Sequence, residues 1–77
     1  MINKNDYKNV YVFAEQRGGV IQPVALELIG KARDLAGALG SKVVAMLAGY
    51  NVEHLIQPLF EYGADEVVVT DHIELKD

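Results

Sequence analysis

The chain contains no cysteine and begins with a polar stretch. Without cysteine it can form neither disulfide bonds nor thiolate metal sites, and such chains are more typical of a reducing compartment than of secretion. Residues 1–6 lack the apolar segment that a signal peptide needs, and the longest wholly apolar run, residues 43–48, is too short to cross a bilayer. We therefore expect a cytoplasmic protein without a membrane span.

Basic residues are also few. The 77 residues carry seven lysines and arginines against eleven acids, which gives a formal net charge of −4. The bases are scattered along the chain: Lys4, Lys8, Arg17, Lys31, Arg33, Lys42 and Lys76. Because binding to a phosphate backbone depends on clustered positive charge, we expect no nucleic-acid partner.

The common catalytic and phosphate-binding motifs are absent as well. Neither G-x-G-x-x-G nor G-x-x-x-x-G-K-[ST] occurs in the sequence. Ser41 is the only serine and has no histidine near it in sequence, while His54 is more typical of a solvated surface histidine. Residues 71–74 hold three potential metal ligands, but an acidic segment after a strand is ordinary. We expect no catalytic residue and no metal site in these 77 residues.

Three apolar runs mark the expected strands, at residues 10–14, 43–48 and 66–70. They are rich in β-branched and aromatic residues and show no apolar/polar alternation, which is typical of strands covered on both faces. Apolar residues at spacings of three and four predict helices over residues 23–39 and 52–62. The resulting βαβαβ order predicts an α/β fold with a parallel sheet, in which the second run is the central strand.

Turn residues set the boundaries of the first helix. Gly18-Gly19 supplies positive φ for a tight reversal, after which Val20-Ile21 is expected to pair with the end of the first strand. Pro23 suits the first helical position, and Gly40 suits the left-handed position after the last helical residue.

Two glycines lie inside the first helix, and two further residues concern the start and the shape of the second. Gly30 and Gly37 lie inside the first helix, where we interpret them as sites of close backbone packing. Asn51 is expected to cap the second helix, and Pro58 to kink it near its middle.

The sheet has two faces, and this chain supplies helices for one of them. If the later strands step outward in one direction, both helices lie on the same face and the other face is bare. Apolar residues nevertheless occur at odd and even positions of the strands, so we expect other elements to cover both faces of the sheet. We therefore interpret the chain as the first βαβαβ half of a three-layer, Rossmann-like parallel sheet, or as a piece held by a partner.

The candidate functional residues follow the strands. Ligands and partners gather at the carboxyl ends of open parallel sheets, which indicates Glu15, Gln16 and Arg17; a solvated loop is the alternative. Gly49 follows the second strand, where a glycine lets a nucleotide or another backbone come close, although a plain loop glycine would look the same. Arg17 and Gly49 are thus the candidate cofactor-binding residues.

Three stretches between residues 9 and 71 match a known family in their order and spacing. They are VYVFAEQRGG at residues 10–19, PVALELIGKARDLA at 23–36 and LFEYGADEVVV at 59–69. Together they resemble the amino-terminal domain of the electron transfer flavoprotein alpha subunit. This resemblance implies a Rossmann-like fold of the adenine nucleotide α-hydrolase type and a heterodimer with a beta subunit of similar fold.

The resemblance also implies what residues 1–77 would contribute. They would be the amino-terminal part of that domain, and the carboxyl-terminal domain that carries FAD would be absent from this chain. No flavin-contacting motif of the family maps onto these residues, so we expect no cofactor bound by this segment alone. The whole protein would act as an electron carrier subunit, and these residues would scaffold the alpha/beta heterodimer.

The expected electron donors are acyl-CoA dehydrogenase-type or other redox partners. Family members of anaerobic origin can hold a second FAD in beta and split electron pairs from NADH. The sequence Glu15-Gln16-Arg17 favours this group. Arg17 resembles a position near the subunit junction, where it would contact beta or a nucleotide held by beta. The alternatives are a nucleotide-binding module of the universal-stress or adenine nucleotide α-hydrolase type and an interaction domain without a ligand.

Overall fold

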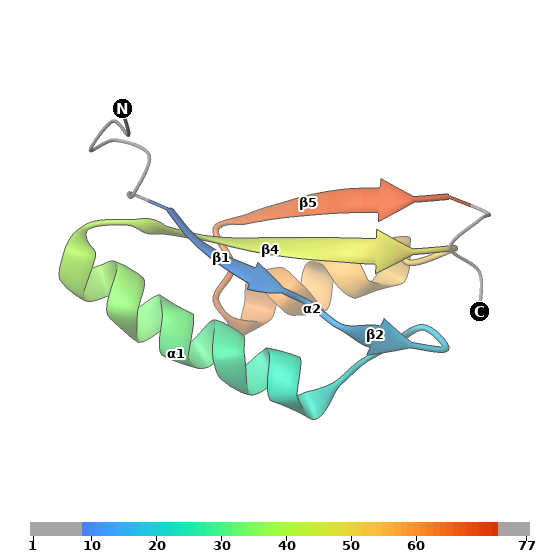
Figure 1. Ribbon diagram of the computed structural model, residues 1–77, viewed down its shortest axis with the longest axis horizontal. Helices are drawn as coiled ribbons and strands as arrows, with labels where there is room; N and C mark the ends of the chain where they lie inside the picture. The colour runs from blue at the N-terminus through green and yellow to red at the C-terminus, as the bar shows by residue number, and fades with distance from the viewer. Residues whose placement is uncertain (1–8, 73–77) are drawn as a thin grey trace.

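A three-stranded parallel sheet with two helices on one face forms the body of the molecule, whose computed structural model describes residues 9–72 (Figure 1). Strand β1 (Asn9–Phe13) pairs with β4 (Lys42–Gly49), and β4 pairs with β5 (Glu66–Asp71). The order β1-β4-β5 confirms the predicted α/β fold, with the second long strand at the centre of the sheet.

Helix α1 (Pro23–Leu39) has the bounds that its sequence pattern predicts. Pro23 begins it, and Gly40 ends it with a left-handed φ of 67° and an N–H that donates to the Ala36 carbonyl. A Cβ added at Gly30 or at Gly37 would meet nothing within 4 Å, so the close backbone packing predicted at these glycines is wrong for the described part of the chain.

The core lies between the helices and one face of the sheet. Paired registers place Val12 beside Ala45 on this face, and Leu47 beside Val69. Helix α1 contributes a stripe of mostly small side chains to the same core: Ala25, Ile29, Ala32 and Ala36. Small residues at these positions suit a helix that lies flat on a sheet.

The second helical segment is shorter than predicted and begins differently. A 3-10 turn, η2 (Glu53–Leu55), precedes helix α2 (Ile56–Tyr62). Asn51 is no helix cap, because it lies before the 3-10 turn in a left-handed conformation with φ of 56°. Pro58 causes no mid-helix kink, since it lies in the first turn of α2, where a missing N–H breaks no intrahelical bond.

The face of the sheet opposite the helices carries exposed apolar side chains. Phe13 of β1 is 58% exposed and lies in register with Met46 of β4, which in turn pairs with Val68 of β5. Tyr11 is also exposed on this face. We call these four residues the open face, and their exposure agrees with the predicted bare side of the sheet.

A small hairpin follows β1. Strand β2 (Gln16–Arg17) pairs with β3 (Val20–Ile21) across Gly18 and Gly19, which have φ of 57° and 81°. Two consecutive positive φ values are what the tight hairpin turn requires. Val20 and Ile21 therefore pair with Gln16 and Arg17, and not with the end of the first strand as the sequence predicts.

The reason is that the chain leaves the sheet one residue after β1. The Ala14 N–H still donates to the Met46 carbonyl, and the next N–H, that of Glu15, donates back to the Phe13 carbonyl.

Among residues 9–72, no helix has both the length and the apolar content needed to cross a membrane.

Candidate functional site

The carboxyl ends of the three parallel strands meet at one edge of the sheet, and the β2–β3 hairpin lies at this same end (Figure 1). We call this end, with the hairpin, the carboxyl edge. It contains both residues that the sequence singles out, Arg17 on β2 and Gly49 at the end of β4.

Arg17 is a highly exposed cation at the tip of the hairpin. Its side chain is 77% exposed and forms an ion pair with Glu15, whose carboxylate oxygen lies 3.4 Å from Nη2. An exposed pair of this kind contributes about 0–1 kcal/mol, so the guanidinium can change partner at little cost. The other described bases lie elsewhere, on α1 and at the start of β4.

Gln16, the neighbour of Arg17, joins the hairpin to the central strand. Its side-chain Nε2 donates to the Ala48 carbonyl at 3.2 Å, and its Oε1 accepts the N–H of Gly19 at 3.0 Å. One amide group thus bridges the end of β4 and the turn of the hairpin.

Gly49 provides the space for this bridge. A Cβ added there would lie 2.5 Å from Gln16 Nε2 and 2.6 Å from Val52 Cγ1, distances that real Cβ atoms do not show. Gly49 itself is buried. The close approach that the sequence predicts at this glycine is therefore present, and the group that comes close is the chain's own Gln16.

His54 holds the hairpin from the other side. Its Nε2 lies 2.9 Å from the carbonyl oxygen of Gly19, and because a carbonyl only accepts, Nε2 carries the proton in this bond. The ring is exposed, as predicted, but it has a specific partner. Both polar groups of the Gly19 backbone are thus engaged by side chains from outside the turn.

Asp71 organises the loop that follows β4. Its two carboxylate oxygens accept the N–H groups of Asn51 at 3.1 Å and Val52 at 3.3 Å. The N–H of His72 donates to the Gly49 carbonyl, which extends the pairing of β5 with β4. Asp71 therefore shapes the loop beside Gly49, a role that no local sequence signal indicates.

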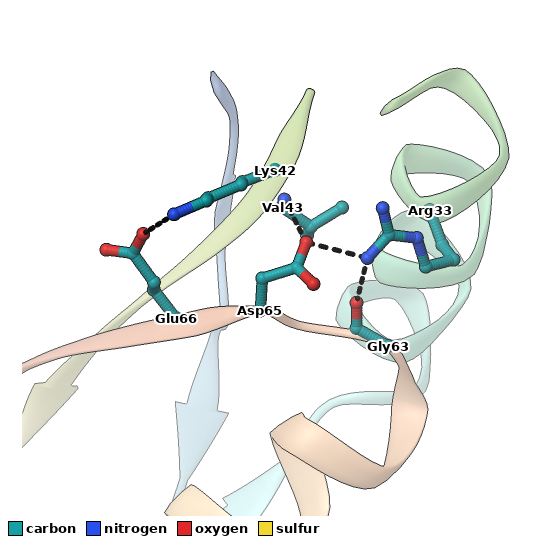
Figure 2. Close-up of polar contacts among 6 residues, drawn as sticks. All are labelled: Arg33, Lys42, Val43, Gly63, Asp65 and Glu66. Atoms are coloured by element: carbon teal, nitrogen blue, oxygen red, sulfur yellow. Dashed lines mark hydrogen bonds and ion pairs between the residues drawn. The ribbon is translucent and has the colours of Figure 1, made fainter. Parts of the chain in front are cut away.

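A second polar cluster lies at the opposite, amino edge of the sheet (Figure 2). Oδ2 of Asp65 accepts the Val43 N–H at 2.8 Å and Nη1 of Arg33 at 2.6 Å, and the same Nη1 donates to the Gly63 carbonyl. Beside it, Lys42 and Glu66 form an exposed ion pair at 3.6 Å.

This amino-edge cluster joins α1, β4 and the start of β5. The Val43 N–H and then the Arg33 guanidinium stabilise the charged carboxylate, and together they hold the pKa of Asp65 below its usual value. The contacts of this cluster join residues of the same chain, so we assign it to stability.

Neither Gly19 nor Gly49 offers a place for a flavin phosphate. A flavin phosphate would need free backbone amides or open space beside a glycine, yet the Gly19 amide is bonded to Gln16 and the space at Gly49 is filled. Within the described range, no buried side-chain polar atom lacks a partner. Nor do residues 9–72 contain a group of three or more potential metal ligands; Glu74 of the acidic segment lies outside this range.

Comparison with known proteins identifies the family. The family model for the electron transfer flavoprotein domain matches residues 10–77. The chain belongs to the electron transfer flavoprotein domain family. The family predicted from the three sequence stretches is thereby confirmed.

Individual members of the electron transfer flavoprotein family are similar along most of this chain. It is 53% identical over 75 residues to protein FixB of Clostridium saccharobutylicum, covering 97% of this chain and 22% of the relative. It is 48% identical over 71 residues to the electron transfer flavoprotein subunit alpha of Clostridium acetobutylicum, covering 92% and 21%.

A third relative has a more specific name. The chain is 44% identical over 75 residues to subunit LctC of the lactate dehydrogenase (NAD(+),ferredoxin) of Acetobacterium woodii, covering 97% of this chain and 18% of the relative. The chain thus spans about a fifth of the length of these curated relatives.

Proposed function

We propose that this chain is the amino-terminal part of an electron transfer flavoprotein alpha subunit and that it scaffolds the heterodimer with a beta subunit. The complex would pass electrons from dehydrogenases or from NADH through FAD. The observation that carries the proposal is the family match over residues 10–77, together with 48% identity to a named alpha subunit. The flavin would perform the redox step, and this segment would position the subunits.

Two further features of the complex belong to the proposal. The name of the enzyme to which LctC belongs contains both NAD(+) and ferredoxin, which supports an electron-bifurcating complex that receives electrons from NADH. For the redox partner we retain an acyl-CoA dehydrogenase-type or other dehydrogenase. FAD would be bound by other parts of the complex, since neither Gly19 nor Gly49 leaves a place for its phosphates.

The apolar surfaces suggest how the scaffold is completed. Besides the open face, a groove runs between the free edge of β1 and α1, and its walls include Val10, Val24, Leu28 and Leu35. We propose that further elements of the same domain, in a longer polypeptide, cover the groove and the open face. Parallel sheets are stable when both faces are covered.

Arg17 is our proposed contact with the beta subunit or with a nucleotide that beta holds. It is the exposed cation of the carboxyl edge, where partners of parallel sheets gather, and its pairing with Glu15 costs little to exchange. A guanidinium suits a carboxylate or phosphate because it donates two parallel hydrogen bonds.

Co-purification with a beta-type subunit tests this proposal. The polypeptide that contains these residues is co-expressed with a tagged beta-type subunit, and the complex is assayed for FAD. We expect a stable complex that contains FAD. Arg17→Ala should weaken the affinity for the beta-type subunit by roughly tenfold, as expected for the loss of one pair of charge-assisted hydrogen bonds.

Lys42→Ala is the matched control. It also removes an exposed cation from an ion pair, but at the opposite edge of the sheet. We expect it to leave the affinity unchanged. Failure to recover any complex with a beta-type subunit would contradict the scaffold proposal, and equal effects of the two variants would contradict the contact by Arg17.

A further inference from the structure

We propose that Gln16 is a positioning residue: it clamps the β2–β3 hairpin to the end of β4 and thereby fixes where Arg17 meets the partner subunit. The inference rests on the proposed function, because it concerns the contact that Arg17 makes there. Gln16 touches neither partner nor cofactor in this proposal and acts through its neighbour.

The first observation is that the hairpin needs contacts beyond its own two strands. It consists of two two-residue strands joined by two glycines, and a hairpin this short is not stable by itself. Its two strands pair with each other, and the Gln22 N–H donates to the Glu15 carbonyl to close its base. Its orientation on the carboxyl edge is therefore fixed by side chains, among them Gln16, His54 and the buried Ile21.

The second observation is that the Gln16 amide uses both of its polar ends across this junction. Nε2 reaches the Ala48 carbonyl of the central strand, and Oε1 reaches the Gly19 amide of the turn. Ala48 lies 32 residues from Gln16 in sequence, so this bond ties the hairpin to the most buried strand of the sheet.

The third observation is that the surroundings are shaped for this side chain. Gly49 leaves the space that Nε2 occupies, and His54 holds the carbonyl of Gly19 from η2. Three hydrogen bonds thus converge on Gln16 and Gly19, which lie on either side of Arg17. Arg17 itself projects into solvent from a hairpin that is fixed on both sides.

Fixing the hairpin matters because an exposed, mobile cation binds weakly. Ordering a loop and a long side chain on binding reduces affinity, and a preorganised loop avoids that cost. The clamp would thus increase the affinity of Arg17 for its partner without adding any contact to the interface.

The test combines hydrogen exchange with a double-mutant cycle on the polypeptide as purified, with and without a beta-type subunit. Gln16→Ala removes both bonds, and we expect exchange in residues 15–22 to become roughly fivefold faster, as for one net hydrogen bond. Gln16→Glu keeps the acceptor for Gly19 but places a carboxylate against the Ala48 carbonyl, so we expect it to release the hairpin from β4 as well.

Gln22→Ala is the matched control on the same hairpin. The Gln22 side chain donates to the nearby Val20 carbonyl in an exposed hydrogen bond. We expect hairpin exchange to stay unchanged in this variant. Exchange in α1 serves as the measure of folding, and it should be the same in all of the variants.

Partner affinity then separates positioning from general stability. Gln16→Ala is expected to weaken binding roughly fivefold when Arg17 is present and to have no effect in the Arg17→Ala background. Unchanged hairpin exchange in Gln16→Ala would overturn the clamp, and so would equal weakening in both backgrounds. If Arg17→Ala alone leaves affinity unchanged, the proposed contact fails, and the exchange data alone decide whether the clamp exists.

Discussion

Asp65 shows how one carboxylate can join three elements. A single oxygen accepts hydrogen bonds from the backbone N–H of Val43 and the guanidinium of Arg33 (Figure 2), and the Asp65 N–H donates in return to the Val43 carbonyl. Both bonds to the carboxylate favour its charged form, which is why its pKa is lowered.

This lowered pKa predicts the acid sensitivity of the fold. In the unfolded chain Asp65 returns to a pKa of about 3.9 and binds a proton more readily than in the folded chain. Its stabilising contribution is complete above that value and is lost as the pH falls through the lower folded pKa. We expect Asp65→Asn to reduce stability near neutral pH and to flatten the loss of stability below about pH 4.

Urea unfolding of both proteins at a series of pH values measures this difference. Arg33→Gln serves as the intermediate case, because it removes the guanidinium and leaves the Val43 N–H in place. Parallel acid profiles for wild type and Asp65→Asn would show that the carboxylate is not linked to folding.

At the scale of elements, the glycines inside α1 cost stability, and the glycine that follows the helix provides it. Gly37 lies in the helix interior with open space around it, whereas Gly40 ends the helix at a φ of 67°. Gly37→Ala should raise the free energy of unfolding by about 0.5–1 kcal/mol, and Gly40→Ala should lower it by about 1 kcal/mol. Chemical denaturation of the pair provides the measurement, and changes of the same sign would contradict this account.

The elements that the sequence predicts well are those set by local pattern. Strands β1, β4 and β5 follow from unbroken apolar runs, and α1 follows from its spacing, Pro23 and Gly40. The start of α2 could not be predicted in this way. The Asn51 backbone is bound by Asp71, twenty residues later, and no local preference of Asn51 for a cap reveals that contact.

In the candidate site, too, local pattern predicts some features, whereas others depend on contacts between distant residues. The rule that function lies at the carboxyl ends of parallel strands indicates Arg17 and Gly49 without any coordinates. The same rule indicates Gln16, but its bond to Ala48 and the bond of His54 to Gly19 could not be predicted, because these partners lie 32 and 35 residues away and depend on how the hairpin folds back. That Gln16 fills the space at Gly49 likewise depends on the tertiary structure.

At the scale of the whole molecule, the sheet is an apolar layer with helices on only one face. Phe13, Met46 and Val68 form a continuous row across β1, β4 and β5 on the open face, and the groove beside α1 adds a second apolar surface. Contiguous exposed apolar surface of this kind promotes association. The isolated 77-residue chain should therefore bind a hydrophobic dye and self-associate.

Two valines of similar exposure test this expectation. Val68 lies on the open face and is 52% exposed, whereas Val20 lies on the hairpin and is 61% exposed. Val68→Lys should weaken self-association roughly tenfold, the equivalent of about 1.5 kcal/mol for one buried valine, and Val20→Lys should change it little. Sedimentation over a concentration series compares them. A monomeric wild type without dye binding would mean that this half-covered sheet is stable alone, and the need for further elements over the open face would disappear with it.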